Sequence, residues 1–318
     1  MRVLLIVNAT ASSVTARRRV VIERALRAGH DLVVEQTQRR GHAAELAHAA
    51  TTDGTELVVV LAGDGTLNEA ADGLRGSHVA LAMLPGGSTN VYARTLGVAD
   101  DVIEATGQLL DAMDERSFVR IPVGLANGRI FLFHAGFGLD AAVIRQVERR
   151  AALKRYVAHP LFLASAFDTW LRRAETRRIQ MDVVFPDGVR FEGVQFVIAS
   201  KTSPWTYLGH RPVVVAPHAG IESDLAITTL RGLSVNFLLR QGIRALRGGK
   251  RFAASKRVDY RPNVTSCRIE SSQPFPWQVD GDYLGERTEV DIELVPDALT
   301  IVVPLTAEAP TRRRRARR

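Results

Sequence analysis

The sequence lacks what cross-links, helical membrane spans and the commonest nucleotide motifs would need. Cys267 is the single cysteine, so an internal disulfide is excluded, in keeping with a reducing cytoplasm. No run of about 20 apolar residues occurs, so no helix is expected to span a bilayer. The apolar run before Asn8 is too short for a signal-peptide core and fits a first strand. Neither G-x-x-x-x-G-K-[ST] nor G-x-G-x-x-G is present, so the usual P-loop is absent.

Size and charge indicate the broad class. The 318 residues suffice for about two domains, and 46% hydrophobic with 24% charged residues is typical of a soluble globular protein. The formal net charge is +8, which favours an anionic partner such as a membrane surface or nucleic acid. Because no aromatic residues alternate with the terminal arginines, an anionic membrane is expected and nucleic acid is not. These arginines are Arg312 to Arg315, Arg317 and Arg318.

Residues 1–120 alternate apolar strands with amphipathic helices. This alternation predicts a doubly wound, mostly parallel, Rossmann-like nucleotide domain of the α/β class. In such sheets the ligand lies at the carboxyl ends of the strands. The expected strands are Val3–Val7, Leu32–Gln36, Leu57–Leu61 and Val79–Leu84, and the expected helices are Val14–Ala28, His42–Ala50, Leu67–Leu74 and Val102–Met113.

After Ser117 the pattern changes to short strands separated by turns. It predicts an antiparallel β-sandwich domain over residues 121–305, followed by a basic, disordered tail over residues 306–318. Two helical insertions are expected, and the first joins basic residues to aromatics, which suits either a membrane interface or a packed helix pair with a solvated basic face. The insertions are Ala141–Arg173 and Val235–Leu246, and the expected strands include Ile130–His134, Val264–Ile269, Val290–Val295 and Thr300–Val303.

The stretch A-G-D-G-T-L-N-E, residues 62–69, joins a buried strand to a helix through a glycine turn. Thr66 lies where an N-cap is expected, and Glu69 completes a capping box. The first N–H groups of such a helix lack helical partners and its dipole is positive there, which predicts a phosphate site. Because Asp64 would repel phosphate, it indicates Mg²⁺ between the two. The alternative is an ordinary strand-to-helix turn with a surface aspartate.

A second glycine turn, L-P-G-G-S-T-N at residues 84–90, follows the next strand. Ser88 or Thr89 is expected to cap a short helix that ends at Thr95, and both hydroxyls suit phosphate oxygens. Carboxyl ends of parallel strands meet at one edge of the sheet, where a nucleotide would bind. The segments expected at this edge are Asn8, Thr37, Gly63–Thr66 and Gly86–Asn90.

Far along the chain, W-Q-V-D-G-D-Y-L-G-E at residues 277–286 places Asp280 and Asp282 on either side of Gly281. A carboxylate near the γ-phosphate could accept the proton of an attacking hydroxyl. A plain hairpin turn is the alternative reading of D-G-D. The polar stretch V-N-A-T-A-S-S, residues 7–13, either closes over a nucleotide or caps the next helix.

Together these motifs resemble the diacylglycerol-kinase catalytic family of bacterial lipid kinases, related to sphingosine and ceramide kinases and, in the nucleotide domain, to NAD kinases. The family's G-G-D-G-T-x-N-E appears as A-G-D-G-T-L-N-E, its P-x-G-T-x-N as P-G-G-S-T-N, and its late D-G-E as D-G-D. Residues 207–219, Y-L-G-H-R-P-V-V-V-A-P-H-A, are similar to the segment leading to the family's regulatory metal loop. The resemblance covers residues 2 to about 304.

The resemblance implies an ATP- and Mg²⁺-dependent kinase with the nucleotide between the two domains and a lipid hydroxyl as acceptor, first of all that of diacylglycerol. Asp280 is then the proton acceptor, and Asp64 holds Mg²⁺ and the phosphates. The residues implied at the nucleotide are Asn8, Ala9, Thr10, Ala11, Ser12, Thr37, Gly63, Asp64, Gly65, Thr66, Leu67, Asn68, Glu69, Ser88 and Asp282.

A second, structural Mg²⁺ in some relatives uses a loop of the form L-D-D-G, which here reads I-E-S-D-L at residues 221–225. If that metal is kept, Asp224 is the expected carboxylate ligand, with Gly220 and Leu225 contributing carbonyls. The chain also opens with N-A-T-A-S instead of N-P-x-S-G, and Asp282 is one methylene shorter than the family's glutamate. The floor of the nucleotide pocket is therefore expected to differ.

Several alternatives stay open at this level. The acceptor could be a sphingoid base, a glycolipid or phosphatidylglycerol. The chain could instead phosphorylate NAD, since that family shares G-G-D-G-T, or be an inactive lipid-binding regulator. The expected location is cytoplasmic, with the basic surface held at the inner face of the membrane, and a homodimer is left open.

Overall fold

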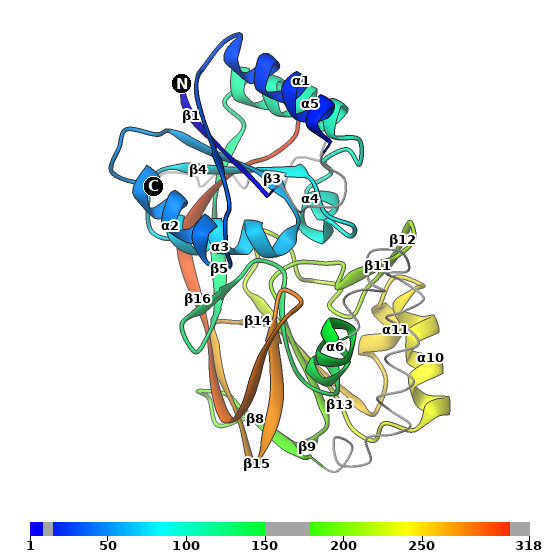
Figure 1. Ribbon diagram of the computed structural model, residues 1–318. Coiled ribbons are helices and arrows are strands. Elements are labelled where there is room, and N and C mark those ends of the chain that lie inside the picture. Colours follow the sequence, from blue (N-terminus) through cyan, green and yellow to red (C-terminus); the bar gives the residue numbers. More distant parts are fainter. Residues whose placement is uncertain (9–14, 150–178, 306–318) are drawn as a thin grey trace, which may run out of the picture. The chain divides into compact units, whose positions relative to one another are not determined.

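The computed structural model describes residues 1–8, 15–149 and 179–305. Contacts divide them into two compact units (Figure 1), Met1–Ile121 with residues 298–305, and Pro122–Asp297. The sequence assigned residues 298–305 to the β-rich domain, but this segment belongs to the first unit. Among the described residues, no helix is long and apolar enough to cross a membrane.

The first unit is built on a parallel sheet, as the alternating pattern predicts. Its strands are ordered β4-β3-β1-β2, and the end of β16 pairs in parallel beside β4 through Thr300 and Ile301. Every residue of β3 and β4 is buried, which explains their unbroken apolar sequences. The bounds are β1 Arg2–Val7, β2 Asp31–Gln36, β3 Leu57–Ala62, β4 Ala80–Pro85 and β16 Asp282–Val302.

Helices cover both faces of this sheet (Figure 1). Helices α1 and α5 lie together on one face, whereas α2 and α3 lie together on the other. Ile22 and Leu26 of α1 and Leu109 of α5 pack with the strand residues Leu5 and Val59 in one apolar cluster. The helices are α1 Ala16–Arg27, α2 His42–Ala50, α3 Asp64–Leu74, α4 Val91–Thr95 and α5 Val102–Asp114.

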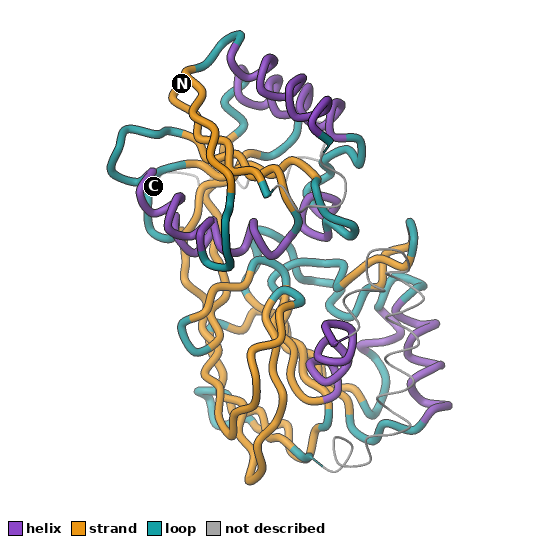
Figure 2. Tube along the Cα trace, viewed as in Figure 1, coloured by secondary structure: helices purple, strands orange, loops and turns teal. Residues whose placement is uncertain are grey.

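The second unit is dominated by strands (Figure 2), and most of them pair antiparallel. Its main order is β14-β13-β10-β7-β15-β16, with β8 and β9 branching from β15 and β11 and β12 forming a separate ribbon. Its strands are β5 Phe118–Ala126, β6 Arg129–Phe131, β7 His134–Gly138, β8 Met181–Val184, β9 Arg190–Val194, β10 Phe196–Ser200, β11 Thr206–Leu208, β12 Arg211–Val213, β13 Leu225–Leu230, β14 Val258–Val264 and β15 Ser266–Val279. Its helices are α6 Leu139–Arg149, α10 Val235–Ala245 and α11 Lys250–Ala253.

Several predicted strands in this unit have the wrong bounds. The segments expected as Val290–Val295 and Thr300–Val303 belong to the single strand β16, because its pairing partners continue where the local pattern weakens. The strand expected over Ile130–His134 is two strands, β6 and β7. They separate at Leu132 and Phe133, whose N–H groups bond to the side chain of Asp280 instead of to a neighbouring strand.

Candidate functional site

The carboxyl ends of the parallel strands bring distant polar residues together in the first unit. Asn8 follows β1, and its side-chain amide donates to the Thr66 hydroxyl at 3.3 Å. The Thr37 N–H, at the end of β2, donates to the Val7 carbonyl at 3.0 Å. The structure therefore gathers these segments at one sheet edge, as the strand pattern predicts.

The two glycine turns pack directly against each other. A Cβ atom added to Gly87 would lie 2.8 Å from the Cα atom of Gly63, a backbone overlap that no rotamer can relieve. The Gly87 N–H also donates to the side chain of Asn90 at 2.9 Å, and that amide donates back to the Gly87 carbonyl. Glycine at this position is therefore required for the two turns to meet.

Asp64 links the first glycine turn to the helix that follows the second. Its two carboxylate oxygens accept the N–H groups of Val91 at 2.9 Å and Tyr92 at 3.1 Å, at the start of α4. A negative charge at a helix N-terminus is stabilised by the unpaired N–H groups and by the dipole. One aspartate thus fixes the spacing of both turns.

This arrangement corrects both capping predictions. Helix α3 begins at Asp64 after the N-cap Gly63, so Thr66 lies inside the first turn, where its hydroxyl meets Asn8. The N-cap residue of α4 is Asn90, with a φ of 43°, and not Ser88 or Thr89. The local sequence could not show that Asp64 accepts the first N–H groups of α4, because Asp64 lies 27 residues before Val91.

A single carboxylate such as that of Asp64 suits Mg²⁺. Its two oxygens each accept one N–H group from the start of α4, which fixes the carboxylate at the sheet edge. Mg²⁺ commonly takes one or two protein carboxylates and completes its shell with phosphate oxygens and water. The described residues contain no group of three or more histidine, cysteine, aspartate or glutamate side chains that could hold a metal.

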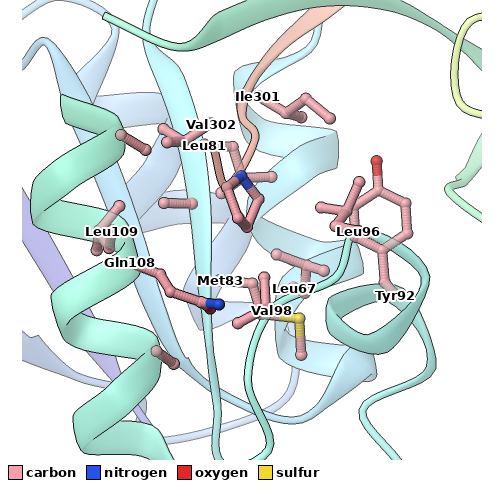
Figure 3. A pocket seen from close by; sticks show the side chains of 14 residues that line it. Leu67, Leu81, Met83, Tyr92, Leu96, Val98, Gln108, Leu109, Ile301 and Val302 are labelled. Atoms are coloured by element: carbon pink, nitrogen blue, oxygen red, sulfur yellow. The ribbon is translucent and has the colours of Figure 1, made fainter. Parts of the chain in front are cut away.

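The other predicted nucleotide residues differ in exposure. Ser88 is exposed, Gly65 and Glu69 are half-buried, and Leu67 and Asn68 are buried. Leu67 points into a cavity of about 20 Å³ among Leu81, Met83 and other apolar side chains (Figure 3), room for about one water molecule. The side chain of Leu67 packs in the apolar core, so only its backbone can face a ligand. Residues Ala9, Thr10, Ala11 and Ser12 lie outside the described residues.

Asp280 forms the tight turn between β15 and β16 in the second unit. Asp280 and Gly281 have φ values of 48° and 87°, the left-handed pair that two-residue hairpin turns need. The buried carboxylate accepts three backbone N–H groups, from Leu132 at 2.7 Å and from Phe133 and His134 at 3.0 Å each. These donors fix the position of the carboxylate.

A buried aspartate that the sequence did not indicate lies beside this turn. The Gln278 amide donates to Asp140 of α6 at 2.7 Å, and its carbonyl accepts the Gly281 N–H at 2.8 Å. A Cβ atom on Gly136 would overlap the Asp140 carboxylate at 1.7 Å, so glycine makes the room. Burial raises the pKa of Asp140 to about 7. The motif G-F-G-L-D carries no signal for this contact, because its partner is 138 residues away.

His134 and Lys201 are further buried titratable groups nearby. Burial lowers the pKa of His134 to about 3, so this imidazole stays neutral and is a weak base. Burial also lowers the pKa of Lys201 to about 8, against the opposing attraction of Asp224 and Glu222. Neither residue was indicated by the sequence patterns.

The expected second metal site does not fit the structure. The Gly220 carbonyl, one of its expected ligands, accepts the Lys201 ammonium group at 3.0 Å. Leu225 is fully buried at the start of β13, and Asp224 is half-buried. A positive charge therefore already lies on this loop. Asp282, the first residue of β16, is half-buried.

Comparison with known proteins supports the motif resemblance. The model of the diacylglycerol kinase catalytic domain matches residues 2–120. The chain is 27% identical over 279 residues to "Probable lipid kinase YegS-like" of Pseudomonas aeruginosa (strain UCBPP-PA14), covering 87% of this chain and 86% of that protein. It is 24% identical over 291 residues to "Diacylglycerol kinase" of Staphylococcus carnosus (strain TM300), covering 90% of each.

Two solved structures share the fold. A diacylglycerol kinase from Bacillus anthracis str. Sterne has a TM-score of 0.71 at 23% identity, covering 96% of this chain and 98% of that chain. An NAD kinase from Archaeoglobus fulgidus in complex with ATP has a TM-score of 0.52 at 12% identity, covering 95% and 93%. At these identities the likeness shows the fold alone, an α/β domain followed by an antiparallel domain.

Proposed function

Because residues 2–120 belong to the diacylglycerol kinase catalytic domain family, we propose that the chain is an ATP- and Mg²⁺-dependent lipid kinase. The observation that carries this proposal is the contact between the two glycine turns, with the Asp64 carboxylate bound to the start of α4. Helix N-termini and glycine backbones at one sheet edge suit a polyphosphate. Diacylglycerol is the first acceptor to test, since a relative is named "Diacylglycerol kinase".

In this proposal the nucleotide is held by the sheet edge of the first unit. Asn8 and Thr37 line it, with residues 9–12, and Gly63, Gly65, Thr66 and Glu69 meet the phosphates with Ser88. Asp64 holds Mg²⁺, which would neutralise charge on the phosphate oxygens when bound. Support comes from the donor geometry at Asp64 and from the Asn8–Thr66 hydrogen bond.

Asp280 is proposed as the proton acceptor. The lipid hydroxyl oxygen forms a bond to the γ-phosphorus, the bond from that phosphorus to the bridging oxygen of ADP breaks, and the hydroxyl proton passes to the carboxylate. Three N–H donors hold the Asp280 carboxylate in place at this turn. A carboxylate suffices as the proton acceptor if the proton leaves late, as a loose transition state allows. Gln278 and Asp140 position the turn.

The basic surface around α10 supports association with an anionic membrane. Arg240, Arg244, Arg251, Lys256 and Arg257 line an open cavity of about 630 Å³, and none of its lining residues in the described part of the chain is acidic. On the same helix, Leu239 and Ile243 are 63% and 52% exposed, one turn apart. Exposed apolar residues beside cations are typical of interfacial helices. The sequence offers the arginine tail for the membrane contact and, as one of two readings, residues 141–173; both segments fall largely outside the described residues.

Charge reversal tests this surface. Arg240→Glu should weaken binding to phosphatidylglycerol vesicles by about 2 kcal/mol, or roughly 30-fold, because a cation contributes about 1 kcal/mol near such a surface. Sedimentation with anionic and with phosphatidylcholine vesicles measures it. Arg287→Glu, an exposed residue beside Glu286, is the matched control. Equal binding of all three proteins would refute the assignment.

The activity itself is tested by labelled ATP and a panel of lipid acceptors in mixed micelles. The proposal expects label in one lipid product, with Mg²⁺ required. Transfer to a sphingoid base, a glycolipid or phosphatidylglycerol would change the substrate and keep the reaction class. Transfer to NAD alone would make the chain an NAD kinase, in line with the shared fold. Absence of ATP binding by calorimetry would favour an inactive lipid-binding regulator.

A further inference from the structure

Lys201 is a buried lysine whose ammonium group has two carbonyl oxygen partners. It follows β10 directly and is 1% exposed. Its ammonium group donates to the carbonyl of Gly220 at 3.0 Å and to that of Ile221 at 2.8 Å. Both carbonyls belong to the loop over residues 217–224, which precedes β13. Burying a charge is costly unless it is paired and hydrogen-bonded, so these contacts are specific.

The loop supplies oxygen ligands of the kind that a hard cation prefers. The Ser223 hydroxyl donates to the Gly220 carbonyl at 2.9 Å and accepts the Gly220 N–H at 2.8 Å. Asp224 and Glu222 contribute negative potential at the ammonium group. Carbonyl, hydroxyl and carboxylate oxygens are the usual ligands of Mg²⁺ and Ca²⁺.

We propose that the Lys201 ammonium group is the resident cation of the 217–224 loop and replaces the second metal ion that the motif resemblance implies there. Two cations on the same carbonyl oxygens would repel each other strongly in a buried site. The loop therefore keeps its conformation without a divalent ion. This inference concerns the loop alone and does not depend on the proposed kinase activity.

The same lysine connects the loop to the segment that holds Asp280. The Lys201 backbone N–H donates to the Phe133 carbonyl at 2.9 Å, and the Phe133 N–H donates to Asp280 at 3.0 Å. One residue thus fixes the 217–224 loop through its side chain and the 132–134 segment through its backbone. Lys201 is a positioning residue. Because its ammonium group is part of the chain, the loop needs no metal ion from solution.

Thermal unfolding of the purified full chain without nucleotide tests the proposal. In the Asp64→Asn background, which removes the proposed nucleotide-site ligand, addition of Mg²⁺ or Ca²⁺ should shift the midpoint by less than about 1 °C. Lys201→Met, of similar length but uncharged, should lower the midpoint by about 5–10 °C, because the Ile221 carbonyl loses the ammonium donor and the Gly220 carbonyl keeps only the Ser223 hydroxyl. Lys250→Ala, an exposed lysine of α11, is the control without a shift.

Chemical rescue separates charge from volume. Lys201→Ala lacks the side chain beyond Cβ, which propylammonium ion replaces in shape and charge. Propylammonium should reverse at least half of the decrease in the unfolding midpoint of Lys201→Ala, whereas propanol, which has the same size, should not. Equal recovery by propanol, an unshifted Lys201→Met, or a rise of several degrees with Mg²⁺ or Ca²⁺ in the Asp64→Asn protein would each overturn the proposal. If the lysine variants do not fold, the metal titration of the Asp64→Asn protein still decides it.

Discussion

Replacing Asp280 by asparagine should destabilise the second unit far more than removal of a surface charge. The carboxylate receives one N–H group on one oxygen and two on the other. In its better orientation, the asparagine carbonyl keeps the N–H groups of Phe133 and His134. Its NH₂ group then faces the Leu132 N–H, so two donors oppose each other.

The magnitude follows from these three bonds. Loss of the bond from Leu132 costs about 1.5–3 kcal/mol, because a hydrogen bond to a charged group is removed and a buried N–H is left unpaired. The other two bonds become neutral and lose about half their strength, together about 1–2 kcal/mol. The expected loss in the free energy of unfolding is therefore about 2.5–5 kcal/mol, which lowers the midpoint by roughly 10 °C in a unit of this size.

Urea and thermal unfolding of Asp280→Asn measure this loss, with Glu293→Gln as the control. Glu293 is an exposed carboxylate on β16, so its variant should stay within about 0.5 kcal/mol of the parent. If Asp280→Asn also stayed within about 1 kcal/mol, the three bonds would not hold the turn and the reasoning would fail. Loss of activity in Asp280→Asn therefore identifies a proton acceptor only where the variant is shown to be folded.

Three further changes test the site. Asp64→Asn should lower the unfolding free energy by only about 1 kcal/mol, through a weaker cap on α4, yet reduce phosphate transfer at least 100-fold; equal losses of stability and activity in kcal/mol would argue against metal binding. Gly87→Ala should destabilise by about 1–3 kcal/mol and weaken ATP binding in calorimetry, because its Cβ meets the Gly63 backbone, whereas Gly107→Ala, in open space on α5, should be neutral or stabilising. Asp140 has a pKa raised to about 7 from 3.8, so the folded protein holds a proton that the unfolded chain releases, and the contribution of Asp140 to the unfolding free energy should fall by about 2 kcal/mol between pH 5 and 7 and flatten above pH 7. His134, with a pKa lowered to about 3, contributes a rise over the same range, so the quantity to measure in urea titrations is the unfolding free energy of the parent minus that of Asp140→Asn; a difference that does not change with pH would refute the assignment.

The sequence predicts the parallel sheet and both glycine turns because each depends on a short, local pattern. Buried β-branched runs before the glycines indicate strands, and parallel strands must end at one edge. The cap that Asp64 provides to α4 could not be predicted, since the turn and the helix are separate in the chain. For α3, the local pattern makes Thr66 as good an N-cap candidate as Gly63. The N-cap is Gly63, which packs on Gly87 of the second turn.

The residues around Asp280 were harder to predict for the same physical reason. The D-G-D motif marked the turn, but its three donors lie about 150 residues earlier in a segment that reads as continuous strand. Asp140 and Lys201 gave no sequence signal, because burial and distant partners determine their charge states. The contact of Lys201 with the loop predicted by resemblance to hold a metal could not be foreseen either, since a motif within residues 220–225 does not include Lys201.

Transfer of the γ-phosphate of labelled ATP to a lipid tests the central claim most directly. Purified protein with diacylglycerol in mixed micelles is expected to place label in the lipid phase with Mg²⁺ present, and Asp64→Asn is expected to place almost none. Label that enters no lipid of the acceptor panel, from a folded protein with Mg²⁺ and ATP supplied, would contradict the assignment of this chain as a lipid kinase.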